Sequence, residues 1–120
     1  MRALLLAAGL GTRLRPLTNV TPKCLVRIKG KPLLEIWLDR LAEAGVGPFL
    51  VNTHHLAPQV ERFVKTSHYC DQVALVHEPV LRGTAGTLIA NIPFFCRQDG
   101  LLIHSDNYCL ADIRAFIGAH

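Results

Sequence analysis

The sequence predicts an α/β domain with three layers, in which helices cover both faces of a mainly parallel sheet. Two observations lead to this fold class. Apolar runs typical of buried strands alternate with segments whose apolar residues recur at helical spacing, in the order strand then helix, four times over. In addition, half of the 120 residues are hydrophobic and 18% are charged, which is the composition of one compact domain and not of a disordered or fibrous chain.

The first strand and the first helix have clear signals. Arg2–Ala8 is almost entirely apolar, which is typical of a strand buried on both faces. Pro32 suits the first turn of a helix, and Gly45 is a stop signal at the other end. Between them the apolar residues fall on one helical stripe: Leu34, Trp37, Leu38 and Leu41. We therefore expect Trp37 to pack in the core.

The middle of the chain repeats this alternation. Phe49–Thr53 and Val73–His77 predict the second and third strands, and Pro58 opens a helix between them. The apolar face of that helix carries Val60, Phe63 and Val64. Thr84 is placed to cap the N-terminus of a third, shorter helix that runs towards Asn91.

The last predicted elements are a strand and a helix. The strand is Leu101–His104, and the stripe of the helix is Leu110, Ile113, Phe116 and Ile117. The sequence ends at His120, directly after this helix. A sheet of four parallel strands is small and leaves an edge strand open. We therefore expect residues 1–120 to be the N-terminal portion of a Rossmann-like domain that is incomplete at its C-terminus.

Composition and cysteine usage exclude several classes of protein. No apolar stretch approaches the roughly 20 residues that cross a bilayer. The apolar start is too short for a signal peptide, and Arg13 and Arg15 follow it without a clean cleavage site. The cysteines show neither zinc-ligand spacing nor the density of a disulfide scaffold: Cys24, Cys70, Cys96 and Cys109. We expect reduced, mostly buried thiols in a cytoplasmic protein without membrane contact.

Positive charge is concentrated at the N-terminus. Residues 1–34 carry seven Lys or Arg and no acid, whereas the rest of the chain carries six bases and nine acids. Such a basic segment predicts an anionic ligand. Its charges lie among glycines and not along a helix face, and no aromatic residue is interleaved with them for base stacking. A small phosphorylated ligand therefore fits better than nucleic acid.

The first strand runs into a glycine-bearing turn at residues 7–16. Gly9 and Gly11 allow backbone N–H groups to approach phosphate oxygens, and Arg13 adds charge. The carboxyl end of a central strand is also where open α/β sheets bind ligands. Neither the dinucleotide fingerprint nor the P-loop fits, because Leu14 replaces the third glycine and no Gly-Lys-Ser/Thr is present. A bare strand-to-loop turn is the alternative interpretation.

A lysine further along completes the pattern. Lys23 is held by a preceding proline and suits a phosphate as a point charge. Two segments carry this pattern: Leu6-Ala7-Ala8-Gly9-Leu10-Gly11-Thr12-Arg13-Leu14-Arg15-Pro16-Leu17-Thr18 and Thr21-Pro22-Lys23. They resemble the signature of the sugar-phosphate nucleotidylyltransferases, also called nucleotide-sugar pyrophosphorylases. The resemblance extends over essentially the whole chain through Gly30-Lys31-Pro32-Leu33, Ala44-Gly45, Glu78-Pro79, Gly83-Thr84-Ala85-Gly86-Thr87-Leu88 and the final Asp106 segment. It implies that residues 1–120 are the nucleotide-binding N-terminal portion of a nucleotidyltransferase domain.

The resemblance implies a reaction in which a sugar 1-phosphate oxygen attacks the α-phosphate of a nucleoside triphosphate and releases pyrophosphate. Such a reaction needs alignment and charge neutralisation more than proton transfer, because the nucleophile is already an anion. The resemblance also implies that Arg13 stabilises charge on the triphosphate and the leaving pyrophosphate, and that Lys23 holds phosphate near the α position. The nucleotide-binding residues that it implies are Leu6, Ala8, Gly9, Gly11, Thr12, Arg13, Lys23, Glu78, Gly83, Thr84 and Ala85.

Asp106, just after the last strand, is the candidate metal ligand. Mg²⁺ takes one or two carboxylates plus phosphate oxygens, so a carboxylate in an acid-poor crevice suits it. A turn or cap aspartate is the alternative, and Asp112 is expected in the first turn of the last helix. The resemblance implies Mg²⁺ as cofactor, a second aspartate beyond these residues, and a separate sugar-binding region. We therefore expect little activity from these 120 residues alone.

Glu78 is expected to face the nucleobase. A carboxylate accepts the paired N1–H and N2–H donors of guanine, whereas uracil offers one donor between two acceptors and suits an amide better. The Glu78-Pro79 pair and the following Gly-Thr-Ala-Gly are also similar to mannose-1-phosphate guanylyltransferases and related heptose enzymes. Arg82 departs from that pattern, which usually has leucine there. The prediction is GTP, with mannose 1-phosphate or a related sugar phosphate.

Other interpretations remain open. A uridylyltransferase acting on an amino-sugar or muramic acid 1-phosphate belongs to the same class, and a non-catalytic nucleotide-sensing module to another. His54 and His55 are adjacent and point in different directions, so we interpret them, with His77 and His104, as loop residues and not as ligands. An open edge strand also leaves a homo-oligomer possible.

Overall fold

The computed structural model describes all residues from 1 to 120, and its centre is a sheet of four parallel strands. These are β1 (Arg2–Leu6), β4 (Phe49–Thr53), β5 (Val73–His77) and β6 (Gly100–His104), in the spatial order β5-β4-β1-β6. The predicted strands are confirmed, although β1 ends two residues early. At that point the Ala7 N–H donates to the side-chain Oδ1 of Asn52 in β4, at 2.6 Å, instead of to a backbone carbonyl of a neighbouring strand.

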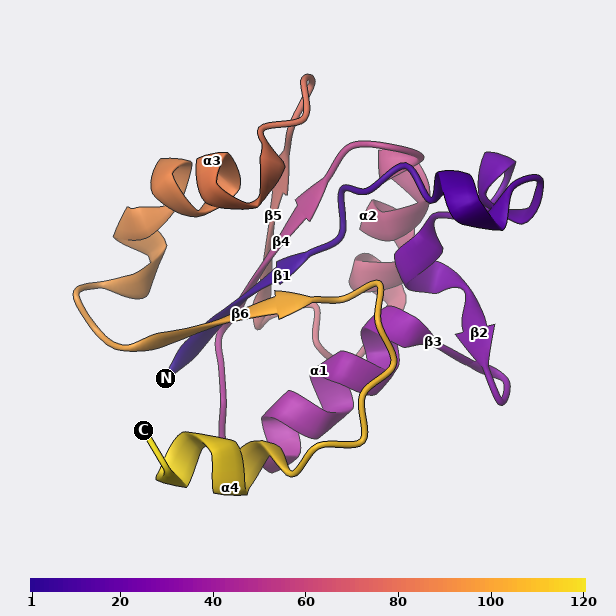
Figure 1. Cartoon of the computed structure of the whole chain (residues 1–120). Coiled ribbons are helices and arrows are strands. Elements are labelled where there is room, and N and C mark those ends of the chain that lie inside the picture. The colour runs from indigo at the N-terminus through magenta and orange to yellow at the C-terminus, as the bar shows by residue number, and fades with distance from the viewer.

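Four α-helices cover the sheet: α1 (Leu33–Glu43), α2 (Ala57–Thr66), α3 (Gly83–Ala90) and α4 (Ile113–Gly118). Figure 1 shows α1 and α4 on one side of the sheet and α3 on the other. Residues of α1 and α2 share one core cluster with side chains of β1 and β4. The predicted three-layer α/β/α architecture with a parallel sheet is therefore confirmed.

The core lies between the sheet and α1. Leu34, Leu38 and Leu41 of this helix are fully buried against the sheet, together with Leu5 and Val51. Each side chain of this size stabilises the fold by roughly 1.5–3 kcal/mol relative to an exposed position. The apolar stripe of α1 thus anchors the helix to the two central strands.

Trp37 joins this core, as its place on the stripe predicts, and is 8% exposed. Its indole N–H donates to the carbonyl oxygen of Asn107 at 2.7 Å. A buried indole usually finds such a partner. The contact ties α1 to the loop that follows β6.

Two helix starts differ from the prediction. Thr84 does not cap α3, because the helix already begins at Gly83 and no side chain accepts a capping hydrogen bond there. At α4 the N-cap is Asp112, which has extended backbone geometry and accepts the Ala115 N–H at 3.0 Å. This helix is therefore shorter than predicted, and Leu110 lies outside it with 77% of its surface exposed.

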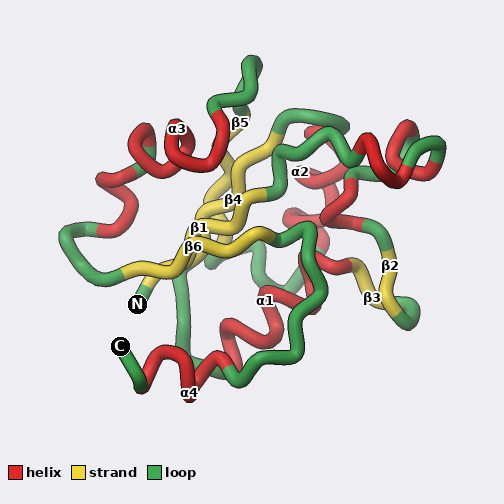
Figure 2. The backbone as a smooth tube through the Cα atoms, viewed as in Figure 1, coloured by secondary structure: helices red, strands yellow, loops and turns green.

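Several short elements have no counterpart in the prediction. A two-stranded antiparallel hairpin pairs β2 (Arg27–Ile28) with β3 (Lys31–Pro32). There are also four 3-10 segments: η1 (Thr12–Leu14), η2 (Leu17–Asn19), η3 (Lys23–Leu25) and η4 (Ile92–Phe95). Figure 2 shows most of them in the stretch between β1 and α1. Elements of two to four residues are too short to produce a periodic pattern in the sequence.

The cysteines are only partly as expected. All four are free, but Cys24 is the one that is buried, whereas Cys70 and Cys96 are exposed. The prediction of mostly buried thiols is therefore wrong, because these two residues lie in turns at the surface. None of the helices is both long enough and apolar enough to cross a membrane.

Candidate functional site

A pocket lies at the carboxyl ends of the parallel strands. Figure 2 shows the backbone segments that follow these strands leaving the sheet at this edge. The pocket collects most of the residues predicted for the site. Those that line it are Leu6, Ala8, Gly9, Lys23, Glu78, Gly83, Thr84 and Asp106. These residues come from four segments of the chain. Three of the segments end or follow parallel strands, so the topology brings them to one edge of the sheet, and Lys23 joins them from η3.

The other predicted residues lie outside the pocket. They are Gly11, Thr12, Arg13 and Ala85. Thr12 and Arg13 are exposed on η1, directly after the glycine loop, residues 7–11. The binding roles of these four residues, including the charge-stabilising role of Arg13, stay predictions.

The two glycines of the first loop have different structural roles. Gly9 lines the pocket, and a Cβ atom there would meet no atom within 4 Å, so the backbone faces open space. Gly11 has a φ of +66°, and a Cβ atom there would lie 2.7 Å from Cγ2 of Thr18. The Thr18 hydroxyl donates to the Gly11 carbonyl at 2.5 Å. Gly9 therefore leaves free space at the pocket wall, while Gly11 permits the left-handed turn that brings its carbonyl to the Thr18 hydroxyl.

Lys23 and Asp106 form an ion pair inside the pocket. Nζ of Lys23 lies 3.2 Å from Oδ2 of Asp106, although the two residues are 83 positions apart in the sequence. Their side chains are 26% and 37% exposed, so both charges remain accessible to a ligand. The predicted phosphate-binding cation and the predicted metal ligand are thus direct neighbours.

The backbone around Asp106 is fixed on both sides. Ser105 is completely buried, and its N–H and hydroxyl both donate to the Leu6 carbonyl, at 3.2 and 2.7 Å. Asn107 accepts the Trp37 indole N–H. These bonds hold the Asp106 carboxylate beside the end of β1.

The donor set suits magnesium bound together with a phosphate ligand. No group of three or more His, Cys, Asp or Glu side chains is placed to hold a metal ion. Asp106 supplies one accessible carboxylate at the pocket wall. Mg²⁺ is commonly held by one or two carboxylates while substrate phosphates and water complete its shell. Asp106 therefore fits as the protein ligand of a metal that arrives with its phosphate partner.

Glu78 is the centre of a buried polar network under the pocket. Its side chain is 1% exposed. Oε2 accepts the Thr87 hydroxyl at 2.6 Å and the Asn52 amide at 3.1 Å, and Oε1 accepts the Arg82 N–H at 3.3 Å. Burial opposes ionisation, but these hydrogen bonds outweigh it and hold the pKa of Glu78 below its usual value.

This network bears on the role predicted for Glu78. Recognition of guanine through paired N–H donors needs both carboxylate oxygens. In this structure Oε2 already accepts two hydrogen bonds, and only Oε1 has capacity for one more. Glu78 therefore organises the floor of the pocket, and two-oxygen recognition of guanine is not available to it in this arrangement.

The pocket also contains residues that sequence reasoning missed. They are Ala7, Cys24, Asn52, Leu81, Thr87 and His104. A buried Asn in an otherwise apolar strand was a signal that pointed to Asn52. His104 is the last residue of β6 and lines the pocket with Asp106, so its interpretation as a loop residue is wrong. Burial raises the pKa of the Cys24 thiol to about 12, which makes Cys24 a protonated wall residue and not a nucleophile.

The adjacent histidines anchor loops. A ring nitrogen of His54 bonds to the Glu78 carbonyl at 2.6 Å, and one of His55 bonds to the Thr18 carbonyl at 2.6 Å. Each ring thus joins the segment after β4 to a different loop at the pocket edge. These contacts agree with the interpretation of both residues as loop residues.

Comparison with known proteins gives a consistent result. The family described as nucleotidyl transferase matches residues 2–120. A mannose-1-phosphate guanylyltransferase catalytic subunit beta from Drosophila melanogaster is 35% identical, over 99% of this chain and 33% of its own length. An N-acetylmuramate alpha-1-phosphate uridylyltransferase from Neisseria meningitidis is 38% identical, over 88% of this chain and 47% of its own.

A solved structure has the same fold and comparable identity. HddC from Yersinia pseudotuberculosis, complexed with GMP-PN, superimposes with a TM-score of 0.84 and 28% identity, covering 98% of this chain and 53% of that one. The chain thus spans between about a quarter and a half of the length of the first curated relatives that it matches.

Proposed function

The chain belongs to the nucleotidyl transferase family, and from this premise we propose that it forms the nucleotide-binding portion of a sugar-1-phosphate nucleotidyltransferase. The reaction is the transfer of a nucleotidyl group from a nucleoside triphosphate to a sugar 1-phosphate, with release of pyrophosphate. One observation carries the proposal: the open backbone at Gly9, the Lys23 ammonium and the Asp106 carboxylate meet in one pocket. This is the combination that a metal-bound polyphosphate needs.

The chemistry follows from charge and alignment. The sugar phosphate oxygen is already an anion, so the residues have to align it in line with the α-phosphate and neutralise charge. Lys23 provides a point charge for phosphate oxygens, and the backbone at residues 7–9 provides close approach. Arg13, exposed on the turn beside the loop, is available for the outer phosphates. Magnesium bound at Asp106 would supply further charge neutralisation on the triphosphate.

GTP is the nucleotide we propose first. The support is the Drosophila guanylyltransferase, which aligns with 99% of this chain, and the HddC structure, which was solved in complex with GMP-PN. The Glu78 side chain no longer supports this choice, because its Oε2 atom is occupied within the protein.

UTP is the second candidate, and the geometry of Glu78 favours it. The remaining acceptor capacity is one lone pair on Oε1, which also receives the Arg82 N–H. A single acceptor matches the one N–H donor of uracil better than the two donors of guanine. The uridylyltransferase from Neisseria, similar over 88% of this chain, agrees with that alternative.

A thermal unfolding series tests the proposal. The chain is heated with Mg²⁺ and, separately, GTP, UTP, dTTP, CTP or ATP. A ligand at one hundred times its Kd stabilises the folded state by about 2.7 kcal/mol, so the cognate nucleotide should raise Tm by several degrees. The largest rise is expected with GTP, and a rise restricted to UTP would exchange the two candidates.

The control is Lys31→Met, which removes a surface lysine outside the pocket and should keep the nucleotide response. Unchanged melting with every nucleotide would contradict the proposal that this chain binds nucleotide.

A further inference from the structure

The open charges of the pocket neutralise each other. Lys23 is the only Lys or Arg among the lining residues, and it pairs with Asp106 at 3.2 Å. Glu78, the other carboxylate, is held inside its own network of Thr87, Asn52 and Arg82. A ligand that enters the pocket therefore meets one pair of opposite charges and not two independent binding groups.

A divalent cation and a triphosphate would each be repelled by one member of this ion pair. A divalent cation at Asp106 would lie next to the ammonium of Lys23. A free triphosphate at Lys23 would lie next to the carboxylate of Asp106. Either ligand alone must break the ion pair and leave one charge unpaired in a half-buried site, which is costly.

We infer that the Lys23–Asp106 ion pair opens in one coupled binding event, in which the cation binds to Asp106 and the phosphate binds to Lys23. The ligand of the pocket is therefore the complex of a divalent cation with a polyphosphate, and the pair discriminates against each component alone. By linkage, the cation raises phosphate affinity by the same factor as phosphate raises cation affinity. The identification of the phosphate ligand as a nucleotide rests on the proposed function.

The first experiment uses metal alone. The affinity of the full chain for MnCl₂ is measured by water proton relaxation, without any nucleotide. Lys23→Met should raise the affinity for Mn²⁺ on the order of tenfold, because Asp106 is released from its partner. In the double variant Lys23→Met, Asp106→Asn the gain should disappear. Unchanged Mn²⁺ affinity in Lys23→Met would overturn the inference.

A matched control is present in the same chain. Lys31 and Asp39 also form an ion pair, at 2.5 Å, but neither residue lines the pocket. Lys31→Met should leave Mn²⁺ affinity as in the unmodified chain. If it raises the affinity as much as Lys23→Met does, the effect is one of net charge and the inference is wrong.

The second experiment uses nucleotide in the absence of metal. Equilibrium dialysis with GTP in EDTA compares the unmodified chain with Asp106→Asn. Removal of the carboxylate should tighten binding of metal-free GTP on the order of tenfold, while Mg²⁺ should strengthen binding to the unmodified chain only. If Asp106→Asn binds metal-free GTP more weakly than the unmodified chain, or equally well, the inference is overturned.

The two experiments separate this inference from the proposed function. If no nucleotide binds even with Mg²⁺, the proposed function fails, whereas the Mn²⁺ measurement still decides whether Lys23 masks Asp106. Circular dichroism and thermal unfolding check that each variant is folded. Lys23→Gln is a second variant for the metal experiment should Lys23→Met not fold.

Discussion

Glu78 shows how one buried carboxylate organises a binding pocket. It connects β4 through Asn52, α3 through Thr87, and the turn before α3 through the backbone of Arg82. Asn52 in turn accepts the Ala7 N–H of the glycine loop. Glu78 therefore joins β4, α3 and the turn before it, and through Asn52 also the loop after β1.

Replacing Glu78 by glutamine should destabilise the fold. The amide would present N–H groups to the Thr87, Asn52 and Arg82 donors, so at least one buried donor would lose its acceptor, at a cost of about 1–3 kcal/mol. Urea unfolding at pH 7 measures the change. Glu61→Gln, at an exposed position on α2, is the matched control and should leave the free energy of unfolding unchanged.

The same substitution should change the pH dependence. The pKa of Glu78 is lower in the folded than in the unfolded state, so its contribution is fully present above the unfolded pKa and is lost as pH falls through the folded pKa. The stability difference between the unmodified chain and Glu78→Gln should therefore shrink in acid, below about pH 4. Equal differences at pH 7 and pH 3 would contradict this assignment of charge.

At the scale of the element, the two glycines of the glycine loop have separate roles: Gly9 leaves free space at the pocket wall, and Gly11 permits a left-handed turn. Gly11→Ala should destabilise the chain by about 1–3 kcal/mol, because an L residue at positive φ is strained and the new methyl group would collide with Thr18. Gly9→Ala should leave stability nearly unchanged, since its Cβ atom has free space, but weaken nucleotide binding in the pocket. Chemical unfolding and nucleotide titration of the two variants separate these effects, and equal destabilisation would contradict them.

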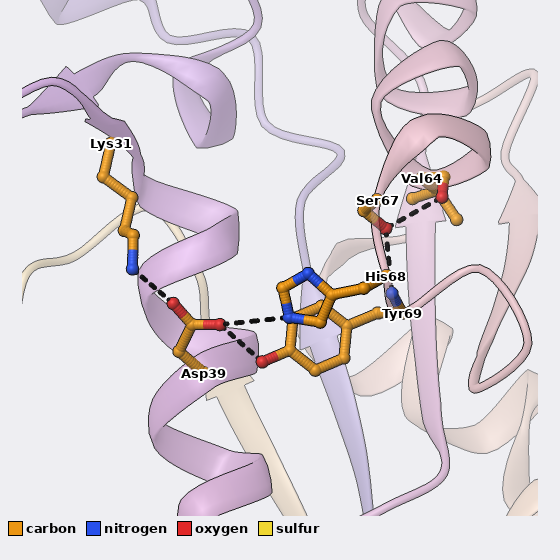
Figure 3. A network of polar contacts seen from close by, with 6 residues as sticks. All are labelled: Lys31, Asp39, Val64, Ser67, His68 and Tyr69. Carbon is orange, nitrogen blue, oxygen red and sulfur yellow. Dashed lines mark hydrogen bonds and ion pairs between the residues drawn. The ribbon is translucent and has the colours of Figure 1, made fainter.

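A network of polar contacts around Asp39 joins α1 to the segment before β5. Figure 3 shows Asp39 of α1 between Lys31 and the Tyr69 hydroxyl, with His68 close by. Burial opposes ionisation of Asp39, but hydrogen bonds from Lys31 and Tyr69 hold its pKa below the usual range. Burial and the neighbouring Asp39 carboxylate raise the pKa of Tyr69, which therefore stays protonated as a donor.

Tyr69→Phe tests this contact. The loss of one hydrogen bond to a partly buried, ionised carboxylate should cost about 1.5–3 kcal/mol. Lys31→Met should have no measurable effect, because the lysine is solvated and a surface ion pair contributes little. Thermal unfolding of both variants is the measurement. A larger loss in Lys31→Met than in Tyr69→Phe would reverse this ranking.

At the scale of the whole molecule, the core and the pocket are connected through Trp37. It is the only tryptophan in the sequence, it is buried on α1, and it bonds to the residue after Asp106. Binding of GTP with Mg²⁺ should therefore change its fluorescence emission. Asp106→Asn should abolish the metal-dependent part of that change. Constant emission in a titration that raises Tm would show that the loop after β6 does not respond to the ligand.

Much of this molecule was predictable from its sequence. Apolar periodicity and turn residues identified the four main strands, and Pro32 and Pro58 marked the first two helices, because these signals are local. The glycine loop, Lys23 and Asp106 predicted a phosphate and metal pocket, and their family resemblance is confirmed. Cytoplasmic location and self-association stay predictions.

Only the tertiary structure decided how these residues meet. The strand order, the pairing of Lys23 with Asp106 and the enclosure of Glu78 by Asn52 and Thr87 join positions from 9 to 83 residues apart. Such contacts depend on how elements pack against the sheet, and no local pattern encodes them. The residue types determined which charges the pocket contains, and the packing of the sheet determined that Lys23 and Asp106 lie 3.2 Å apart in it.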